Sequence, residues 1–168
     1  MDGIVLVEDS RQKPGRHDKK EAYWQRKGIR VIRSKLYAGD ITLLHNQRVC
    51  VDTKANLDEW ASNIVHDHAR VAHEADRAHE NGIRLIFLIE NSEGICTIEG
   101  IRQWSNPRWH KWQKQKSKPN RKPPVTSEYL AKATKTFAEH HHCQFAFSSP
   151  ENAGRAVLYL LTGKDFGS

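Results

Sequence analysis

Two aspartates and a lysine lie at the ends of two neighbouring apolar segments of the sequence. Asp40 follows a glycine directly before one segment, and Asp52-Thr53-Lys54 ends the next. Because side chains alternate along a strand, Asp52 and Lys54 share one face, and Asp40 can reach the same point if the segments pair as a hairpin. Carboxylates bind hard divalent cations, which stabilise charge on phosphoryl oxygens and lower the pKa of an attacking water. These residues therefore indicate a metal site suited to phosphodiester hydrolysis.

Each member of this group has a distinct expected role. Asp40 and Asp52 would hold the metal ion, and the carbonyl oxygen of Thr53 could add a further ligand. The Lys54 ammonium would orient water or stabilise charge that develops in the transition state. An Asp and a Lys two residues apart also occur by chance in many soluble proteins, where they end a solvated strand. The position of both aspartates at the ends of apolar strands favours a site, since sites gather there in α/β sheets.

The pattern of apolar residues predicts the elements that would position this group. Short aliphatic runs alternate with segments of helical periodicity, of which residues 57–79 form the longest. Residues 83–89 (IRLIFLI) are almost all apolar, as in a central strand covered on both faces. The order predicts one α/β domain over residues 1–168, with a central mixed sheet flanked by helices. The other expected strands cover residues 4–7, 29–33, 41–44, 48–53, 95–98 and 143–147, and the other expected helices cover 18–27, 126–140 and 150–161.

Taken in order, the polar residues near these elements resemble the signature of the XPF-type nuclease domain (the excision repair cross-complementation group 4 domain), a branch of the PD-(D/E)XK nucleases. That signature is a strand ending D-x-R-E, then G-D-Y, E-R-K, a helix with S-I and G-R-L-x-x-Q, and a strand ending L-I-E. The resemblance covers nearly the whole chain, and an ordered series is more specific than any one of its parts. The matching segments are Asp9-Ser10-Arg11-Gln12, Gly39-Asp40-Ile41, Asp52-Thr53-Lys54, Ser62-Asn63-Ile64, Arg70-Val71-Ala72-His73-Glu74 and Leu88-Ile89-Glu90.

The resemblance implies a restriction-endonuclease-like α/β fold and a DNA endonuclease that depends on Mg2+ or Mn2+. Its substrate would be branched, flap or junction DNA in recombination or repair, and the protein would act as a homodimer. Carried over by position, Asp40 and Asp52 look like metal ligands and Lys54 like the catalytic lysine. Asp9 resembles a third acidic member of the metal site. Arg11 resembles the signature arginine, which would organise the site or contact phosphate through its planar guanidinium.

Three residues of the long predicted helix can point at the same site. Arg70, Glu74 and Arg77 lie at i, i+4 and i+7, and therefore on one helix face. We expect Glu74 to join the catalytic group and the two arginines to contact nucleic acid. The structural alternatives are an ordinary i, i+4 ion pair between Arg70 and Glu74 and a loop ion pair between Asp9 and Arg11.

The chain departs from the family pattern at several positions. Gln12 replaces the acidic residue of D-x-R-E, and Asp52-Thr53 replaces Glu-Arg, which keeps a shorter carboxylate and loses the arginine. Glu74 stands where the family often has Gln, so our hypothesis is that it returns a carboxylate to the site. A catalytically inactive DNA-binding or scaffolding subunit with the same fold is the alternative function.

Residues 102–124 (RQWSNPRWHKWQKQKSKPNRKPP) combine tryptophans, cations and prolines with almost no aliphatic residue, which predicts an exposed basic loop or insertion. Aromatic stacking surfaces and cations together favour contact with DNA. The alternative is that the tryptophans, Trp104 first, pack on the domain while the lysines keep a loop soluble. The candidate nucleic-acid contacts of this segment are Arg102, Arg108, Trp109, Lys111, Trp112, Lys114, Lys116, Lys118, Arg121 and Lys122.

The bulk composition agrees with a polyanionic partner. Lys plus Arg outnumber Asp plus Glu by 27 to 20, giving a net charge of +7. There is no long apolar run and no signal-like start, so we expect no membrane partner and a cytoplasmic location, in a bacterium or a phage-infected host.

The three cysteines, Cys50, Cys96 and Cys143, fit no disulfide framework and are expected to be buried thiols. The run His140-His141-His142 suggests zinc, but adjacent side chains cannot converge on one ion, and a helix-end run is favoured. The sequence also shows no helix-hairpin-helix tail, so we expect DNA to be bound by the nuclease domain, the basic segment or partners.

Overall fold

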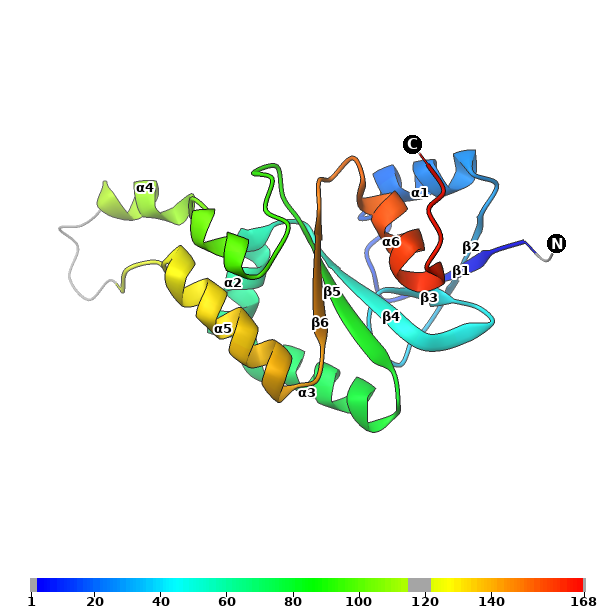
Figure 1. The fold of residues 1–168 in the computed structure, drawn as a ribbon, viewed down its shortest axis with the longest axis horizontal. Helices are drawn as coiled ribbons and strands as arrows, with labels where there is room; N and C mark the ends of the chain where they lie inside the picture. Colours follow the sequence, from blue (N-terminus) through cyan, green and yellow to red (C-terminus); the bar gives the residue numbers. More distant parts are fainter. Residues whose placement is uncertain (1–2, 115–121, 168) are drawn as a thin grey trace.

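The computed structural model describes residues 3–114 and 122–167, and it contains one six-stranded mixed sheet (Figure 1). The strands follow the spatial order β2-β1-β3-β4-β5-β6. β1 is parallel to β2 and antiparallel to β3, β3 is antiparallel to β4, and β4, β5 and β6 run parallel. The strand bounds are β1 Val5–Asp9, β2 Arg30–Ser34, β3 Ile41–Leu43, β4 Asn46–Lys54, β5 Arg84–Glu90 and β6 Gln144–Ser148.

Helices cover both faces of the sheet, so the predicted α/β fold is confirmed (Figure 1). Side chains of β5 alternate between the two cores: Phe87 packs with α2, α3 and α5, and Leu88 packs with α1 and α6. This double burial explains why β5 is apolar throughout. The helix bounds are α1 Asp18–Arg26, α2 Leu57–His66, α3 His68–Glu80, the 3-10 helix η1 Glu99–Gln103, α4 Arg108–Gln113, α5 Ser127–His140 and α6 Ala153–Thr162.

The sheet brings the ends of β1 and β4 and the start of β3 to one point. The backbone N–H of Asp9 donates to the carbonyl of Asp40 (2.7 Å), and the N–H of Asp40 donates to the carbonyl of Val51 (2.9 Å). Asp52 is the next residue of β4. Three aspartates that are far apart in the sequence therefore lie at one edge of the sheet.

Gly39 makes the sharp turn that leads into β3. Its φ is +70°, a conformation that L side chains rarely adopt. A Cβ there would lie 3.0 Å from the Cβ of Cys50 and 3.2 Å from the carbonyl oxygen of Val51. Only glycine fits both requirements, and the turn places Asp40 directly at the sheet edge.

The structure corrects three expectations about the elements. The single helix predicted over residues 57–79 is two helices that break at Asp67, and both place apolar faces on the same core, which hid the break. The longest described helix is α5, with 14 residues. Residues 95–98 form no strand, because Asn91 accepts from the N–H of Ile95 and donates to its carbonyl (2.9 Å each), closing a loop before η1. Cys96 is exposed, whereas Cys50 and Cys143 are buried as expected.

The basic segment is more ordered at its start than the loop we expected. Trp104 is buried in the core, and Arg108–Gln113 form the short helix α4. Of the described part of the chain, no helix is long and apolar enough to cross a membrane.

Candidate active site

A cavity of about 670 Å³ opens at the sheet edge where the three aspartates meet. β1, β3 and β4 supply its floor, and α3 supplies one wall. Nine residues predicted for the site lie together here. They are Asp9, Arg11, Asp40, Asp52, Thr53, Lys54, Arg70, Glu74 and Arg77, and they share the lining with Gln12, Arg16, Gly39, Glu59, Ala69 and His73.

Asp52 and Lys54 form the buried centre of this cavity. The Lys54 Nζ lies 2.5 Å from Asp52 Oδ1, and each side chain is only 6% exposed. Burial, with the nearby charge of Asp40, raises the pKa of Asp52 to about 8, although Lys54 acts in the opposite direction. Burial alone would lower the pKa of Lys54, but the attraction of Asp52 outweighs it and the pKa rises. The lysine therefore stays charged.

Asp40 is held by three donors. Its Oδ2 accepts from the backbone N–H (2.8 Å) and the hydroxyl (3.0 Å) of Thr53, and its Oδ1 accepts from the side-chain amide of Gln12. The residue that departs from D-x-R-E is thus a direct partner of a floor carboxylate. An amide at this position supplies a donor, which a second carboxylate could not do.

Asp9 is bound by its near neighbour Arg11. The Arg11 backbone N–H donates to Asp9 Oδ1 (2.8 Å), and Arg11 Nε donates to both carboxylate oxygens (3.0 Å each). Burial tends to raise the pKa of Asp9, but the bonds from Arg11 prevail and lower it. Arg11 also donates to the carbonyl of Leu36 (3.0 Å), so this ion pair fixes the loop after β2 as well as the floor of the cavity.

Glu74 connects α3 to the turn before β3. Its Oε1 accepts from the backbone N–H of Gly39 (2.9 Å), and its Oε2 lies 3.9 Å from Arg70. The guanidinium of Arg77 lies over the ring of Tyr37, 5.4 Å from the centroid, while its buried Nε has no hydrogen-bond partner. The predicted helix face therefore does bring Arg70, Glu74 and Arg77 to one cavity, as a cationic wall around one carboxylate.

Sequence reasoning missed Arg16, Glu59 and His73 as cavity residues. Arg16 donates to Glu59 (2.7 Å) and to the carbonyl oxygen of Thr53 (3.5 Å) from the loop before α1. No local signal marks Arg16, because its partners lie at least 37 positions away. Glu59 had a signal, since it stands three residues after Asn56, the residue that caps α2.

Glu90, the last residue of the matching series, has a different partner. It ends β5 but forms a buried ion pair with Lys20 of α1, with 2.5 Å between the charged atoms. This pair joins the sheet to α1 beside the cavity, and Glu90 does not belong to its lining.

The oxygen atoms of the floor suit a hard divalent cation. Asp52 Oδ1 is buried without a hydrogen-bond partner, although it lies within ion-pair distance of Lys54. Asp40 and Thr53 are its neighbours in the lining, and both oxygens of Asp40, like both oxygens of Asp9, accept hydrogen bonds from the protein. Within residues 3–114 and 122–167, no three His, Cys, Asp or Glu side chains are arranged to hold a metal ion. A cation would therefore rely on one or two carboxylates and water, the ligand set that Mg2+ usually has.

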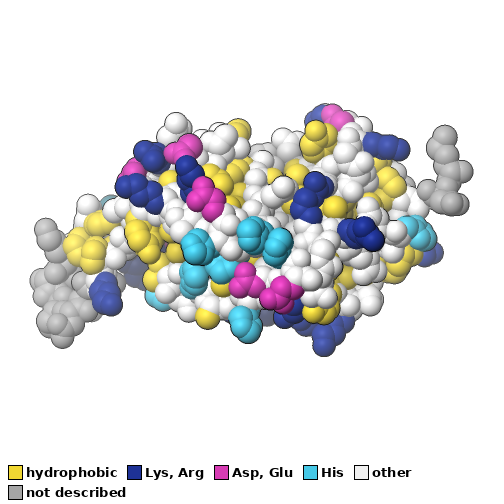
Figure 2. All heavy atoms as spheres, turned by 60° about the horizontal axis from the view of Figure 1, so that its bottom comes forward, with side chains coloured by type: hydrophobic (Ala, Val, Ile, Leu, Met, Phe, Trp, Pro, Cys, Tyr) yellow, Lys and Arg dark blue, Asp and Glu magenta, His cyan; other side chains and the backbone are white. Residues whose placement is uncertain are grey.

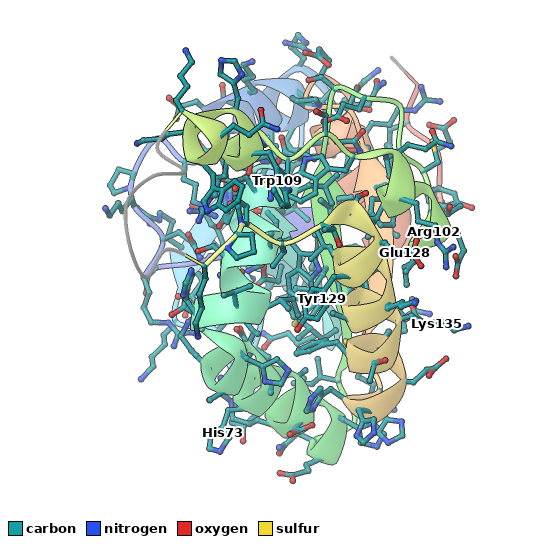
Figure 3. The ribbon with its side chains drawn as sticks, turned by 90° about the vertical axis from the view of Figure 1, so that its left-hand side faces the viewer. His73, Arg102, Trp109, Glu128, Tyr129 and Lys135 are labelled. Atoms are coloured by element: carbon teal, nitrogen blue, oxygen red, sulfur yellow. The ribbon has the colours of Figure 1, made fainter. Side chains whose placement is uncertain are left out.

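None of the described residues predicted as DNA contacts in the basic segment lines this cavity. Figure 3 shows Trp109 on α4 and His73 of the cavity at opposite ends of the view, with Arg102 beside Glu128. Arg102 pairs with Glu99 and Glu128, and Arg108 pairs with Asp58 at 2.6 Å. These two arginines already have acidic partners, which weakens the case that they contact DNA directly. The predicted contacts Lys116, Lys118 and Arg121 lie outside the described residues.

A second hollow, of about 500 Å³, lies between α2 and the basic segment. Lys111, Trp112 and Lys122 line it beside Val65, which is exposed. The rings of Trp109 and Trp112 meet edge to face at 5.3 Å, and Trp109 Nε1 donates to the carbonyl of Val125 (3.3 Å). Lys114 is exposed at the end of α4. The tryptophans thus pack on the domain and leave cations at the rim.

The histidine run ends α5, and no metal-binding cluster forms there among the described residues. His141 lies 2.7 Å from Asp76 of α3, and His142 stacks on His79. Figure 2 shows histidine side chains gathered with acidic ones on this face. The run lies at the end of α5, the position favoured from the sequence, and these contacts join it to α3.

The sheet and the helices on its two faces have a fold similar to that of the XPF-type nuclease domain. Among solved structures, XPF from Aeropyrum pernix matches with a TM-score of 0.62, over 93% of this chain and at 14% sequence identity. The same protein in complex with DNA gives a TM-score of 0.61, over 94% of this chain, also at 14% identity. This chain spans 62% of the length of either structure. The fold expected from the resemblance is confirmed, whereas no protein-family model and no curated protein matches the chain.

Proposed function

We propose that this protein is a divalent-metal-dependent endonuclease that hydrolyses phosphodiester bonds of DNA. The observation that carries the proposal is the buried pair of Asp52 and Lys54 beside Asp40, at the floor of a cavity with arginines in its wall. The XPF-type fold supports it, because the structural neighbour has been captured in complex with DNA.

Each residue of the cavity would have a separate role in such a reaction. Asp40 and Asp52, with the carbonyl of Thr53, would hold Mg2+ or Mn2+. When bound, such a cation lowers the pKa of a water molecule and stabilises charge on the phosphoryl oxygens. Lys54 stays charged, because of Asp52, and can orient that water or the phosphate. Asp9 orders Arg11 beside it.

The cationic wall would receive the DNA backbone. Arg70 is exposed, and within residues 3–114 and 122–167 it lies within ion-pair distance only of Glu74, at 3.9 Å, so its guanidinium is available to a phosphate. Arg77 lines the same cavity and adds a second positive charge to its wall. Lys111, Lys114 and Lys122 would extend the contact beyond the cavity, and Trp112 would offer a stacking surface.

A cleavage assay tests this proposal. Labelled duplex, flap, splayed and four-way DNA are incubated with the protein in Mg2+, Mn2+ or EDTA. We expect cutting only with the metals, a preference for branched substrates, and a loss of at least about 100-fold in Asp52→Asn and Lys54→Met. Asp165→Asn is the matched control, because Asp165 is exposed and pairs with Arg155 on α6.

The same assay also tests the alternative function, that of a catalytically inactive DNA-binding subunit. Two observations favour that rival: no three acidic or histidine side chains of the described residues are arranged around an ion, and Gln12 takes the place of an acid. Tight binding of DNA without cutting in either metal would refute the endonuclease and support the inactive subunit. The proposed homodimer is tested separately, by light scattering on the purified protein.

A further inference from the structure

A buried histidine lies behind the floor of the cavity. His17 is only 2% exposed and lies directly before α1, and no pattern in the sequence marks it. Its Nδ1 lies 2.6 Å from Oε1 of Glu8 in β1, and its Nε2 lies 3.0 Å from Oγ1 of Thr53 in β4. Thr53 Oγ1 in turn contacts Asp40 Oδ2 at 3.0 Å. Four side chains thus form one continuous chain, Glu8 to His17 to Thr53 to Asp40, which we call the histidine relay.

The hydroxyl of Thr53 has a single hydrogen, which it donates to Asp40. The contact between His17 Nε2 and Thr53 Oγ1 then requires the ring nitrogen to donate to the hydroxyl oxygen. Each member of the relay therefore faces the next through one contact of 2.6 to 3.0 Å.

The relay fixes the direction of the Asp40 carboxylate. The Thr53 N–H and hydroxyl both donate to the same oxygen, Asp40 Oδ2. Thr53 can offer its hydroxyl in that direction because His17 occupies the other side of Oγ1. The far end is anchored too, since Glu8 lies 3.2 Å from Arg33 through its second oxygen. Partners of this kind, one step behind a metal-binding carboxylate, set its orientation and its affinity.

We infer that His17 is a positioning residue, which orients the Asp40 carboxylate through the hydroxyl of Thr53. This inference rests on the proposed function for its consequence, the affinity of the floor for a divalent cation. The imidazole belongs to His17, the residue before α1, and it meets the hydroxyl of the threonine that stands where the resembled family has arginine.

Calorimetric titration with Mn2+ alone measures that consequence. Thr53→Val keeps the shape of the side chain and removes the hydroxyl, so we expect the Kd for Mn2+ to rise about 10-fold. Thr53→Ser keeps the hydroxyl and should restore the affinity. The matched control is Thr42→Val, because Thr42 is a buried threonine of the next strand whose hydroxyl donates to a backbone carbonyl (2.7 Å). An unchanged Kd in Thr53→Val, with Mn2+ binding intact in the wild type, would overturn the inference.

A second measurement needs neither metal nor activity. The 15N and 1H signals of the His17 ring report on its partners. We expect them to move in Thr53→Val and in Asp40→Asn, and to return near their wild-type positions in Thr53→Ser. Chemical shifts of the His17 ring that stay the same in both Thr53→Val and Asp40→Asn would refute the relay. His17→Gln, which keeps a donor but not the ring, should raise the Kd for Mn2+ as Thr53→Val does.

Different results would refute the proposed function and the histidine relay. A wild-type protein that binds no Mn2+ and cuts no DNA would refute the proposed function, and the ring signals would still decide whether the relay orients Asp40. A wild-type protein that binds Mn2+ and cuts DNA, with Thr53→Val equal to it in both assays, would refute the relay alone.

Discussion

At the scale of single residues, charged groups of the site change each other's pKa. Burial raises the pKa of Asp52, the charges of Asp40 and Glu74 raise it further, and Lys54 acts in the opposite direction. Asp9 has the opposite shift, because Arg11 donates to both of its oxygens. Two carboxylates at one sheet edge therefore differ in their readiness to hold a proton, and only Asp52 keeps an oxygen without a hydrogen-bond partner.

The pKa of Asp52 predicts how stability depends on pH in EDTA. An Asp titrates near 3.8 in the unfolded chain and near 8 in this fold, so unfolding releases a proton between those values. The stabilisation that the held proton provides is complete below about pH 4 and is lost as the pH rises through about 8. We expect the free energy of unfolding to fall over this window, by a few kcal/mol for a shift of several units. Denaturant titrations at several pH values measure it.

Asp52→Asn is the control for this expectation, because the amide has no proton to release in that range. Its stability should lose most of the dependence between pH 5 and pH 8 (roughly the window set by the two pKa values). The idea fails if wild type and variant show the same slope.

At the scale of elements, the positions of functional residues depend on a few turns and strand ends. The rules of alternation and of strand ends pointed to Asp40, Asp52 and Lys54, because each lies in or beside an apolar run. The resemblance added Asp9, and the fold brings all four residues to one cavity. The same rules could not find His17 or Arg16. Their partner Thr53 lies 36 and 37 positions further along the chain, and only the pairing of β1, β3 and β4 brings them together.

The turn at Gly39 offers a test of how an element positions the site. Gly39→Ala would add a Cβ 3.0 Å from that of Cys50, at a φ of +70°, and should destabilise the fold by about 2 to 4 kcal/mol. Thermal unfolding measures the change. Gly28→Ala is the matched control: its φ is +68°, but a Cβ there meets nothing within 4 Å, so its cost should stay near 1 kcal/mol (roughly the penalty of the left-handed conformation). Equal losses in the two variants would show that the close approach to Cys50 is unimportant.

The break between α2 and α3 shows what periodicity cannot reveal. Residues 57–79 keep one apolar stripe, so the sequence pattern continues through Asp67 while the helix does not. Arg70, Glu74 and Arg77 nevertheless share a face, because all three follow the break and belong to α3. The prediction for their common direction survived, since it depended on spacing within a single helix.

At the scale of the whole molecule, the charge is divided between two regions. The net charge is +7, yet the floor of the cavity is acidic and the cations lie in its wall and around the hollow beside α4. Such a division lets a polyanion be attracted over a wide surface and still bring a single phosphate to the carboxylates. The acidic partners of Arg102 and Arg108 leave Lys111, Lys114 and Lys122 as the exposed cations of the described part of the basic segment.

This distribution predicts a change in the salt dependence of DNA binding. Replacing Lys111 and Lys122 by Gln should weaken binding to all DNA sequences and reduce the slope of log K against log salt by about 0.9 for each lost phosphate contact. Fluorescence anisotropy between low and physiological salt measures the slope. Lys164→Gln, near the C-terminal end of α6, serves as the control. An unchanged slope in the double variant would place DNA elsewhere on the protein.

The hydrogen bond between Glu74 and the Gly39 amide joins the wall of the cavity to its floor. The floor comes from residues 9–54, while Arg70 and Arg77 belong to α3, whose side chains form the wall. A displacement of α3 can reach the turn before β3 through this hydrogen bond and through the contact of Arg77 with Tyr37, and Asp40 follows that turn. Under the proposed function, binding of the DNA backbone by α3 and orientation of the Asp40 carboxylate would therefore be mechanically connected through Glu74.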